Sequence, residues 1–95
     1  YQLHGHTVNL SGGGMAVSCH PNTPVKKGHR LTGELSLPEG GILPVNVEIV
    51  RVEPAEGRRT RTMCYCRFVR MFSKDQAAIV RLCHAREREL RFTTR

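Results

Sequence analysis

Hydrophobic and polar residues alternate over much of the chain, the pattern of β-strands with one buried face. The clearest case is residues 30–37, where Leu31, Gly33, Leu35 and Leu37 alternate with polar side chains. Similar patterns predict four further strands at residues 1–10, 15–19, 42–53 and 58–69. Proline- and glycine-rich turns separate the strands at residues 20–24, 38–41 and 54–57.

The alternation also predicts which side chains share a face. In the first strand these are Leu3, Gly5, Thr7 and Asn9; in 42–53 they are Val45, Val47, Ile49 and Arg51. In 58–69, Met63, Tyr65, Arg67 and Val69 share one face, and Cys64, Cys66 and Phe68 share the other. Pro44 indicates a sheet edge or a bulge, because proline cannot donate to a ladder.

The period changes after residue 69 and predicts one helix, from Phe72 until it frays near Thr93-Thr94. Ser73 and Gln76 have the spacing of a capping box, and Asp75 suits the positive end of the helix dipole. The expected apolar stripe contains Ile79, Leu82, Cys83 and Leu90 and is interrupted by Arg86. Glu87 and Arg91 are expected to pair on the outer side. Such a stripe has to cover either the sheet or a partner.

Short strands joined by tight turns favour a β-barrel or a β-sandwich. The chain has 95 residues and shows no internal repeat or linker, so we expect a single domain over residues 1–95. Hydrophobic residues make up 39% of the chain and tryptophan is absent, so the core depends on aliphatic side chains, methionine and three phenylalanines.

The chain is strongly basic, with a net charge of +7. A basic surface favours anionic partners such as nucleotides, nucleic acids, acidic proteins or anionic membranes. One arginine cluster is Arg58, Arg59 and Arg61, and a second follows the tail at Arg81, Arg86, Arg88, Arg91 and Arg95. For both clusters an ordinary solvated surface is the favoured interpretation. No apolar run is long enough to span a membrane, and no signal-peptide pattern is visible.

Four cysteines and five histidines raise the question of a metal site. The pair Cys64 and Cys66 lacks a second pair at zinc-ribbon spacing. His4 and His6 share a strand face, but two ligands do not make a structural zinc site. We therefore expect no metal and no cofactor, and reduced thiols packed as small apolar groups in a cytoplasmic protein.

The stretch from Thr7 to Val17 carries the most distinctive chemistry. Asn9 and Ser11 lie where an apolar strand meets three consecutive glycines, Gly12, Gly13 and Gly14, which lead into the next strand. Glycine permits φ > 0 and a sharp reversal, and a turn without side chains exposes backbone amides to a ligand. The same residues are also ordinary turn-formers that bond their own backbone. A small-molecule or phosphate site and a plain tight hairpin both fit this pattern.

The segment Asn9-x-Ser11-x-x-Gly14 resembles the (Asp/Asn)-x-Ser-x-x-Gly signature of the PilZ family, bacterial domains that bind cyclic di-GMP on a small β-barrel. The Gly-Gly-Met-Ala-Val continuation and the late strand Cys66-Arg67-Phe68-Val69 are also similar to PilZ order, most closely to the flagellar-brake type. The resemblance implies an all-β fold, a small antiparallel barrel of about six strands with a C-terminal α-helix. It also implies that Asn9 and Ser11 bond the guanines and phosphates, and that Gly12, Gly13 and Gly14 allow close approach.

The chain departs from the family pattern in one respect. Members that bind the dinucleotide carry an Arg-x-x-x-Arg segment ahead of the Asn-x-Ser motif, whereas no arginine precedes Arg30 in this sequence. Arg91-Phe92-Thr93-Thr94-Arg95 has the spacing but lies at the far end of the chain. We therefore expect a PilZ-like domain that lacks its N-terminal arginine segment. Either the segment lies outside these residues, or the domain is degenerate.

The resemblance predicts a cyclic di-GMP receptor or adaptor domain in a bacterial signalling protein that regulates motility or exopolysaccharide. The alternative is a degenerate PilZ domain that contacts a protein partner through its basic C-terminal helix. We expect no nucleic-acid partner, because the few aromatics form no stacking platform. We expect no enzyme activity either. The sequence has no Gly-x-Ser-x-Gly nucleophile elbow, and it has no pair of acidic residues arranged beside a histidine. The oligomeric state stays open.

Overall fold

A computed structural model describes residues 3–57, 60–84 and 90–94. It contains six strands and one helix in the order β1 (His4–Leu10), β2 (Gly14–Cys19), β3 (Arg30–Ser36), β4 (Ile42–Glu53), β5 (Thr62–Phe68), α1 (Ser73–His84) and β6 (Arg91–Thr94). The bounds of β4 agree with the predicted strand. Among the described residues, Leu3 lies outside β1, and Thr60, Arg61 and Val69 lie outside β5, so the predictions ran too far there.

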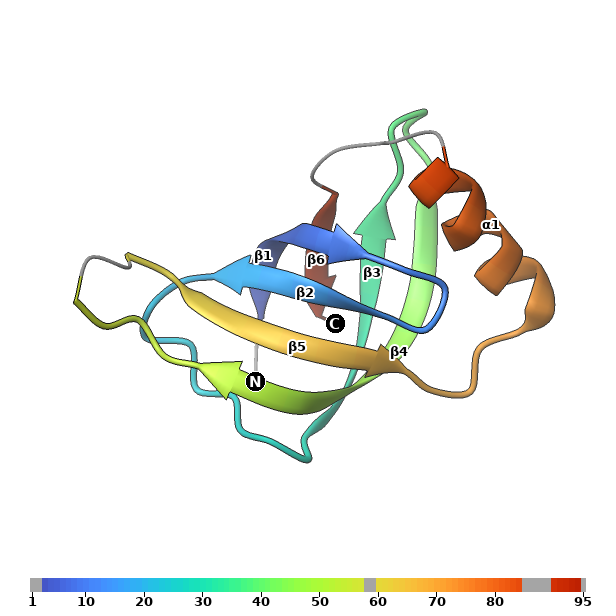
Figure 1. The fold of residues 1–95 in the computed structure, drawn as a ribbon. Helices are drawn as coiled ribbons and strands as arrows, with labels where there is room; N and C mark the ends of the chain where they lie inside the picture. The colour runs from blue at the N-terminus through green and yellow to red at the C-terminus, as the bar shows by residue number, and fades with distance from the viewer. Residues whose placement is uncertain (1–2, 58–59, 85–89, 95) are drawn as a thin grey trace.

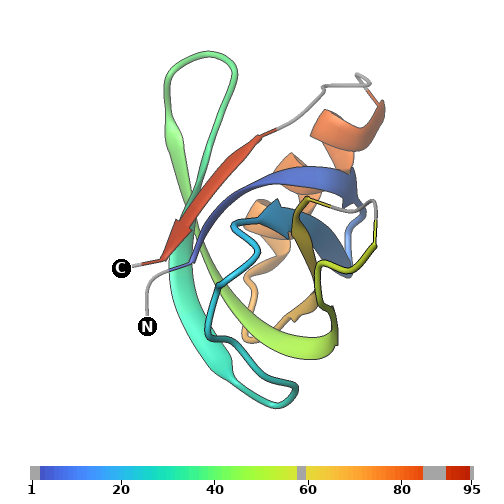
Figure 2. The same ribbon diagram turned by 90° about the vertical axis from the view of Figure 1, so that its left-hand side faces the viewer.

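The six strands form a closed antiparallel barrel in the order β1-β2-β5-β4-β3-β6, which confirms the predicted fold class (Figures 1 and 2). Strand β6 closes the barrel by pairing with β1 through Phe92–Gly5 and with β3 through Phe92–Leu35. The predicted long helix is therefore wrong at its end: Arg91–Thr94 is a strand. Phe92 and Thr94 are buried there, and the ladder hydrogen bonds outweigh the helical spacing of Leu90.

Helix α1 lies beside the β1–β2 turn and covers that end of the barrel (Figure 1). Ile79 is fully buried in the barrel core, and Leu82 and Cys83 pack against the core. Of the two alternatives, the sheet or a partner, the apolar face of the helix therefore covers the sheet of the barrel. The Gln76 side chain donates to the carbonyl of Gly12 instead of completing the predicted capping box. The predicted positions of Arg86 and Glu87 lie outside the described residues.

Two β-bulges shift the predicted faces. In β1 the register with β2 moves from Thr7–Val17 to Asn9–Ala16, so Val8 is an extra residue. In β4 the register with β5 moves from Ile49–Cys66 to Arg51–Tyr65, so Val50 is an extra residue. A bulge changes which face the following side chains take. Asn9 and Arg51 are consequently exposed instead of sharing the buried face of the residues before them, and Val8 and Val50 are exposed too.

Pro44 lies on an edge, as predicted. Strand β4 pairs with β3 along Ile42–Glu48 but with β5 only from Val47 onward. Pro44 therefore occupies the part of β4 where β3 is its strand neighbour on one side and no strand pairs on the other side among the described residues. The missing N–H of proline costs least at such an edge.

Three thiols, of Cys19, Cys64 and Cys66, lie in the barrel core, while Cys83 is half-buried on α1. The Sγ atoms of Cys19 and Cys64 are 3.5 Å apart. Their hydrogen bond lowers the pKa of Cys19 and raises the pKa of Cys64. Burial raises the pKa of the Cys66 thiol to about 12. All four cysteines are free, as predicted, and the three core thiols pack as small apolar groups.

We expect the thiol reagent DTNB to modify Cys83 quickly in the folded protein and the other three cysteines only after unfolding, because a buried thiol cannot reach the reagent. The absorbance of the thiolate that DTNB releases measures the rate of modification directly. Cys83→Ser should remove the fast phase. A fast phase that persists in that variant would show that the core thiols are accessible and contradict the burial.

Candidate functional site

The loop between β1 and β2 brings the predicted site residues together at one end of the barrel (Figure 1). Asn9 and Ser11 are both exposed, as is Gly13 at the tip of the loop. The Asn9 side-chain amide makes no hydrogen bond within the described residues, and neither do the backbone N–H groups of Gly12 and Gly13. These groups offer several hydrogen-bond donors in a region without bulky side chains.

Ser11 closes the loop. Its backbone N–H donates to the carbonyl of Gly14 at 2.9 Å, and its hydroxyl both donates to that carbonyl and accepts from the Gly14 N–H at 3.2 Å. The hydroxyl keeps one acceptor site after these bonds. The turn-forming interpretation of Ser11 is therefore correct for this structure, and it leaves the exposed Asn9 amide unaffected.

Neighbouring elements hold the loop from behind through its carbonyl groups. The Gln76 amide of α1 donates to Gly12 O at 3.1 Å, and the Phe68 N–H at the end of β5 donates to Gly13 O at 2.9 Å. With both carbonyls engaged by the barrel and the helix, the peptide N–H groups are the part of the loop left for another partner. This arrangement suits an anion more than a cation.

Close approach explains the glycine at position 14, and none of the three loop glycines uses left-handed backbone. Positive φ occurs at Gly28, Gly40 and Gly57, and at none of the three loop glycines, so the expected use of φ > 0 in this turn is wrong. A Cβ on Gly14 would overlap the carbonyl oxygen of Cys66 and lie 3.2 Å from the Cα of Arg67. Gly14 is thus required by the packing of β2 on β5.

Gly14→Ala should lower the free energy of unfolding by about 1–3 kcal/mol, the usual cost of overpacking. Gly13→Ala is the matched control, since a Cβ there meets nothing within 4 Å, and its stability should stay the same or rise slightly. Urea denaturation of both variants provides the comparison. Equal losses would contradict the packing role assigned to Gly14.

A row of neighbouring side chains, exposed at Asn9 and Arg51, half-buried at Tyr65 and buried at Ala16, continues from the loop across four strands. The register places Asn9 of β1 opposite Ala16 of β2, Ala16 opposite Tyr65 of β5, and Tyr65 opposite Arg51 of β4. The Arg51 guanidinium lies 4.0 Å from the centre of the Tyr65 ring, and the Tyr65 hydroxyl donates to Glu53 at 2.7 Å. The small Ala16 therefore lies between an amide and a fixed aromatic ring. We call these four residues the Asn9–Arg51 row.

The next row begins at Gly14 and runs through Arg67 and Glu48 to Arg30. Arg67 donates to Glu48 Oε1 at 2.6 Å, whereas Arg30 lies 3.7 Å from the same oxygen. The loop and both rows together present cationic, carboxylate, amide and aromatic groups across β1, β2, β5, β4 and β3.

Comparison with protein families shows to which family the chain is related. The family model described as the PilZ domain matches residues 1–85. The chain belongs to the PilZ domain family. PilZ domains are cyclic di-GMP-binding adaptor domains and not a catalytic family. Searches of curated proteins and of solved structures each return no significant match.

Asn9, Ser11 and Gly14, the residues that resemble the family's motif, all lie on the β1–β2 loop and its flanking strands. Sequence reasoning did not identify Tyr65 as a neighbour of the motif, and it placed Arg51 on the wrong face. A usable signal was present: Asn9 and Arg51 are polar residues at positions that the alternation assigns to the core. A polar residue in a buried phase is a reason to expect a bulge.

Other predicted groups do not join this site. His4 and His6 are exposed on β1, and the described residues contain no group of three or more potential metal ligands. Arg91 lies on β6 opposite His6, so it does not belong to a basic helix as predicted. Arg58, Arg59, Arg86, Arg88 and Arg95 lie outside the described residues. Within the described part of the chain, every helix is too short or too polar to cross a bilayer.

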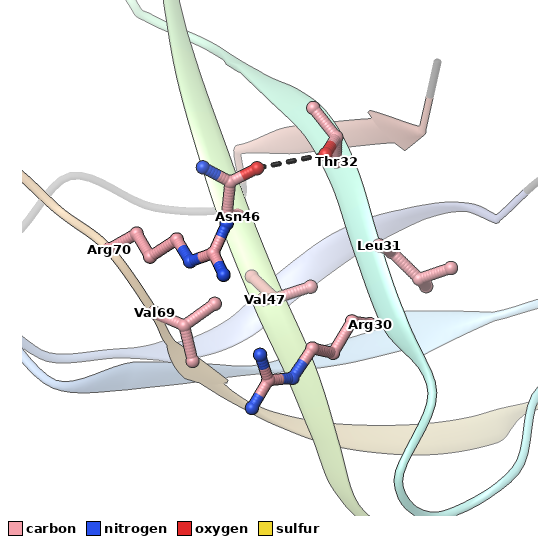
Figure 3. Close-up of a pocket in the computed structure, with 7 residues that line it drawn as sticks. All are labelled: Arg30, Leu31, Thr32, Asn46, Val47, Val69 and Arg70. Carbon is pink, nitrogen blue, oxygen red and sulfur yellow. Dashed lines mark hydrogen bonds between the residues drawn. The ribbon is translucent and has the colours of Figure 1, made fainter.

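A hollow lies between the β3–β4 pair and the residues that follow β5, and it shares Arg30 with the second row (Figure 3). It has a volume of about 200 Å³ and adjoins a second hollow of about 420 Å³. Thr32, Asn46 and Arg70 line both. We call the two hollows together the Arg30–Arg70 cleft. The first is lined by Arg30, Leu31, Thr32, Asn46, Val47, Val69 and Arg70.

Proposed function

We propose that this PilZ domain is a cyclic di-GMP receptor or adaptor domain of a bacterial signalling protein that regulates motility, exopolysaccharide production or biofilm formation, and that it acts in the cytoplasm. The observation that supports this most is the exposed Asn9 amide beside the N–H groups of Gly12 and Gly13, none bonded within the described residues. A guanine edge and a phosphate are the chemical groups that such donors recognise.

In this proposal the ligand lies along the Asn9–Arg51 row. Asn9 bonds a guanine edge, and the phosphates face the loop N–H groups and Ser11. The Ser11 hydroxyl exchanges its 3.2 Å bond to the Gly14 carbonyl for a ligand oxygen. Tyr65, held by Glu53 and covered by Arg51, provides a rigid surface for base contacts next to the small Ala16. The flagellar-brake subtype stays a prediction.

Asn9→Ala and Ser11→Ala should each weaken cyclic di-GMP binding about tenfold or more, because each removes hydrogen bonds to a charged or polar ligand. The test is a calorimetric titration of the domain with any residues encoded ahead of Tyr1 included. Asn22→Ala is the matched control, because Asn22 is an exposed asparagine in the loop between β2 and β3. Loss of binding in the Asn22 variant, or unchanged binding in both motif variants, would refute this assignment.

The alternative is a degenerate PilZ domain that binds a protein and not the dinucleotide. No arginine lies within residues 1–29, so an Arg-x-x-x-Arg segment, where the gene encodes one, lies ahead of Tyr1. The predicted contact surface for such a partner is the basic C-terminal helix. Of the arginines predicted for that helix, Arg81 lies in the described part of α1. Reading the encoded residues ahead of Tyr1 discriminates: an Arg-x-x-x-Arg segment favours the receptor, and its absence favours the protein-binding domain.

A further inference from the structure

Arg70 has a strained backbone and a side chain that pairs with none of the described residues. Its φ is 52°, and among the described residues it is the only non-glycine residue with a positive φ. Such a conformation disfavours an L side chain with a Cβ, and strain of this kind concentrates at functional positions. The Arg70 guanidinium makes no hydrogen bond or ion pair with any described residue. The fold thus keeps an arginine where glycine would relieve strain.

Arg70 and Arg30 reach into the same hollow from opposite sides (Figure 3). Arg30 is 61% exposed, and its carboxylate neighbour, Glu48 Oε1, already accepts a closer bond from Arg67. Asn46 uses its oxygen to accept from Thr32 at 2.8 Å, which leaves the two N–H bonds of its amide as donors. The first hollow therefore presents two guanidinium groups and an amide but no carboxylate among its lining residues.

The adjoining hollow is more apolar. Pro44, Met71 and Phe72 line it, and Phe72 is 72% exposed, an unusual state for a phenylalanine. Lys74 and Asp75 also line this hollow, so the two hollows together carry three cations and one carboxylate. Exposed aromatic and methionine side chains beside arginine are typical of the centre of a protein interface. Pro44 interrupts the β4 edge, so addition of a strand is disfavoured.

We propose that the Arg30–Arg70 cleft is a docking site for an acidic segment of a partner protein, whose carboxylates meet Arg30 and Arg70 and whose apolar side chain packs on Phe72. Charge complementarity selects this occupant. A second copy of the chain also carries a net charge of +7 and is repelled. An open cleft of this kind encloses little of a small molecule, which favours a protein segment.

The test uses short random peptides displayed on phage and selected on the 95-residue chain. The enriched peptides should combine acidic residues with a neighbouring apolar residue. A synthetic peptide from the selection should lose about tenfold or more in affinity with Arg70→Gln and with Phe72→Ser. Arg81→Gln is the matched control, because it removes the same charge from an exposed position on α1, and it should leave the affinity unchanged.

Several results would overturn the proposal: no enrichment, enriched peptides without acidic residues, or equal loss of affinity in the Arg81 variant. Dimerisation of the chain, or binding to phosphatidylglycerol vesicles, that Arg70→Gln abolishes would assign the cleft to a second copy or to a membrane, and would also overturn it. Arg70→Gly separates folding from binding. Its thermal midpoint should not fall, since glycine accepts the backbone conformation, while the peptide affinity falls as in Arg70→Gln.

Discussion

Phe92→Ala should lower the free energy of unfolding by about 3–5 kcal/mol, the largest stability effect that we expect from a single substitution in this domain. Phe92 is the largest side chain with no exposed surface. It lies on β6, the four-residue strand that closes the barrel between β1 and β3. Its ring fills the space above Gly33, where an added Cβ would lie 2.7 Å from two ring carbons.

Urea denaturation of Phe92→Ala measures this effect, with Phe72→Ala as the matched control. Phe72 is 72% exposed, so its replacement should change the stability by less than about 0.5 kcal/mol. The comparison also tests the barrel itself. If the two phenylalanines cost the same, Phe92 does not occupy the core and β6 does not close the sheet.

The second large effect concerns the ligand. The 95-residue chain alone should bind cyclic di-GMP only weakly or not at all, because the sequence holds no arginine ahead of the Asn9–Gly14 motif. Charge-assisted hydrogen bonds contribute about 1.5–3 kcal/mol each, so two missing arginines correspond to a hundredfold loss or more. The guanidinium fork matches both phosphate and guanine, and backbone N–H groups do not replace it.

Calorimetric titration of the 95-residue chain checks this expectation. The control is the same titration with any residues encoded ahead of Tyr1 included. If those residues contain two arginines spaced by three, that protein should bind far more tightly than the 95-residue chain. Micromolar or tighter binding by the chain alone would contradict the expectation, and the Asn9–Arg51 row would then have to supply the missing energy.

The alternation of apolar residues predicted five strands well, because a barrel strand has one buried face and the pattern reports that face. It did not predict β6, which is only four residues long and follows a helix. Leu90 and Phe92 are buried by long-range pairing, with the Leu90 N–H donating to Thr7 Oγ1 and Phe92 lying opposite Gly5. Neither partner is close in sequence, so no local pattern revealed them.

In the candidate site, too, local patterns were predictable from the sequence and long-range neighbours were not. Asn9, Ser11 and Gly14 form a short local pattern that the sequence shows directly, and the structure keeps them together on the β1–β2 loop and its flanking strands. The neighbours Tyr65 and Arg51 depend on strand order, since β5 lies between β2 and β4 in the barrel. Two bulges then decide that Asn9 and Arg51 face outward. Register is a property of a pair of strands, so the sequence of a single strand does not determine it.

In our proposal, cyclic di-GMP binds at the β1–β2 loop and along the Asn9–Arg51 row. Amide chemical-shift mapping by NMR tests it most directly, using isotopically labelled domain with any residues encoded ahead of Tyr1 included. We expect saturable shifts that are largest at Gly12, Gly13 and Gly14 and extend to Ala16 and Tyr65. Absence of saturable shifts, or shifts confined to Thr32, Asn46 and Arg70 around the Arg30–Arg70 cleft, would contradict the claim.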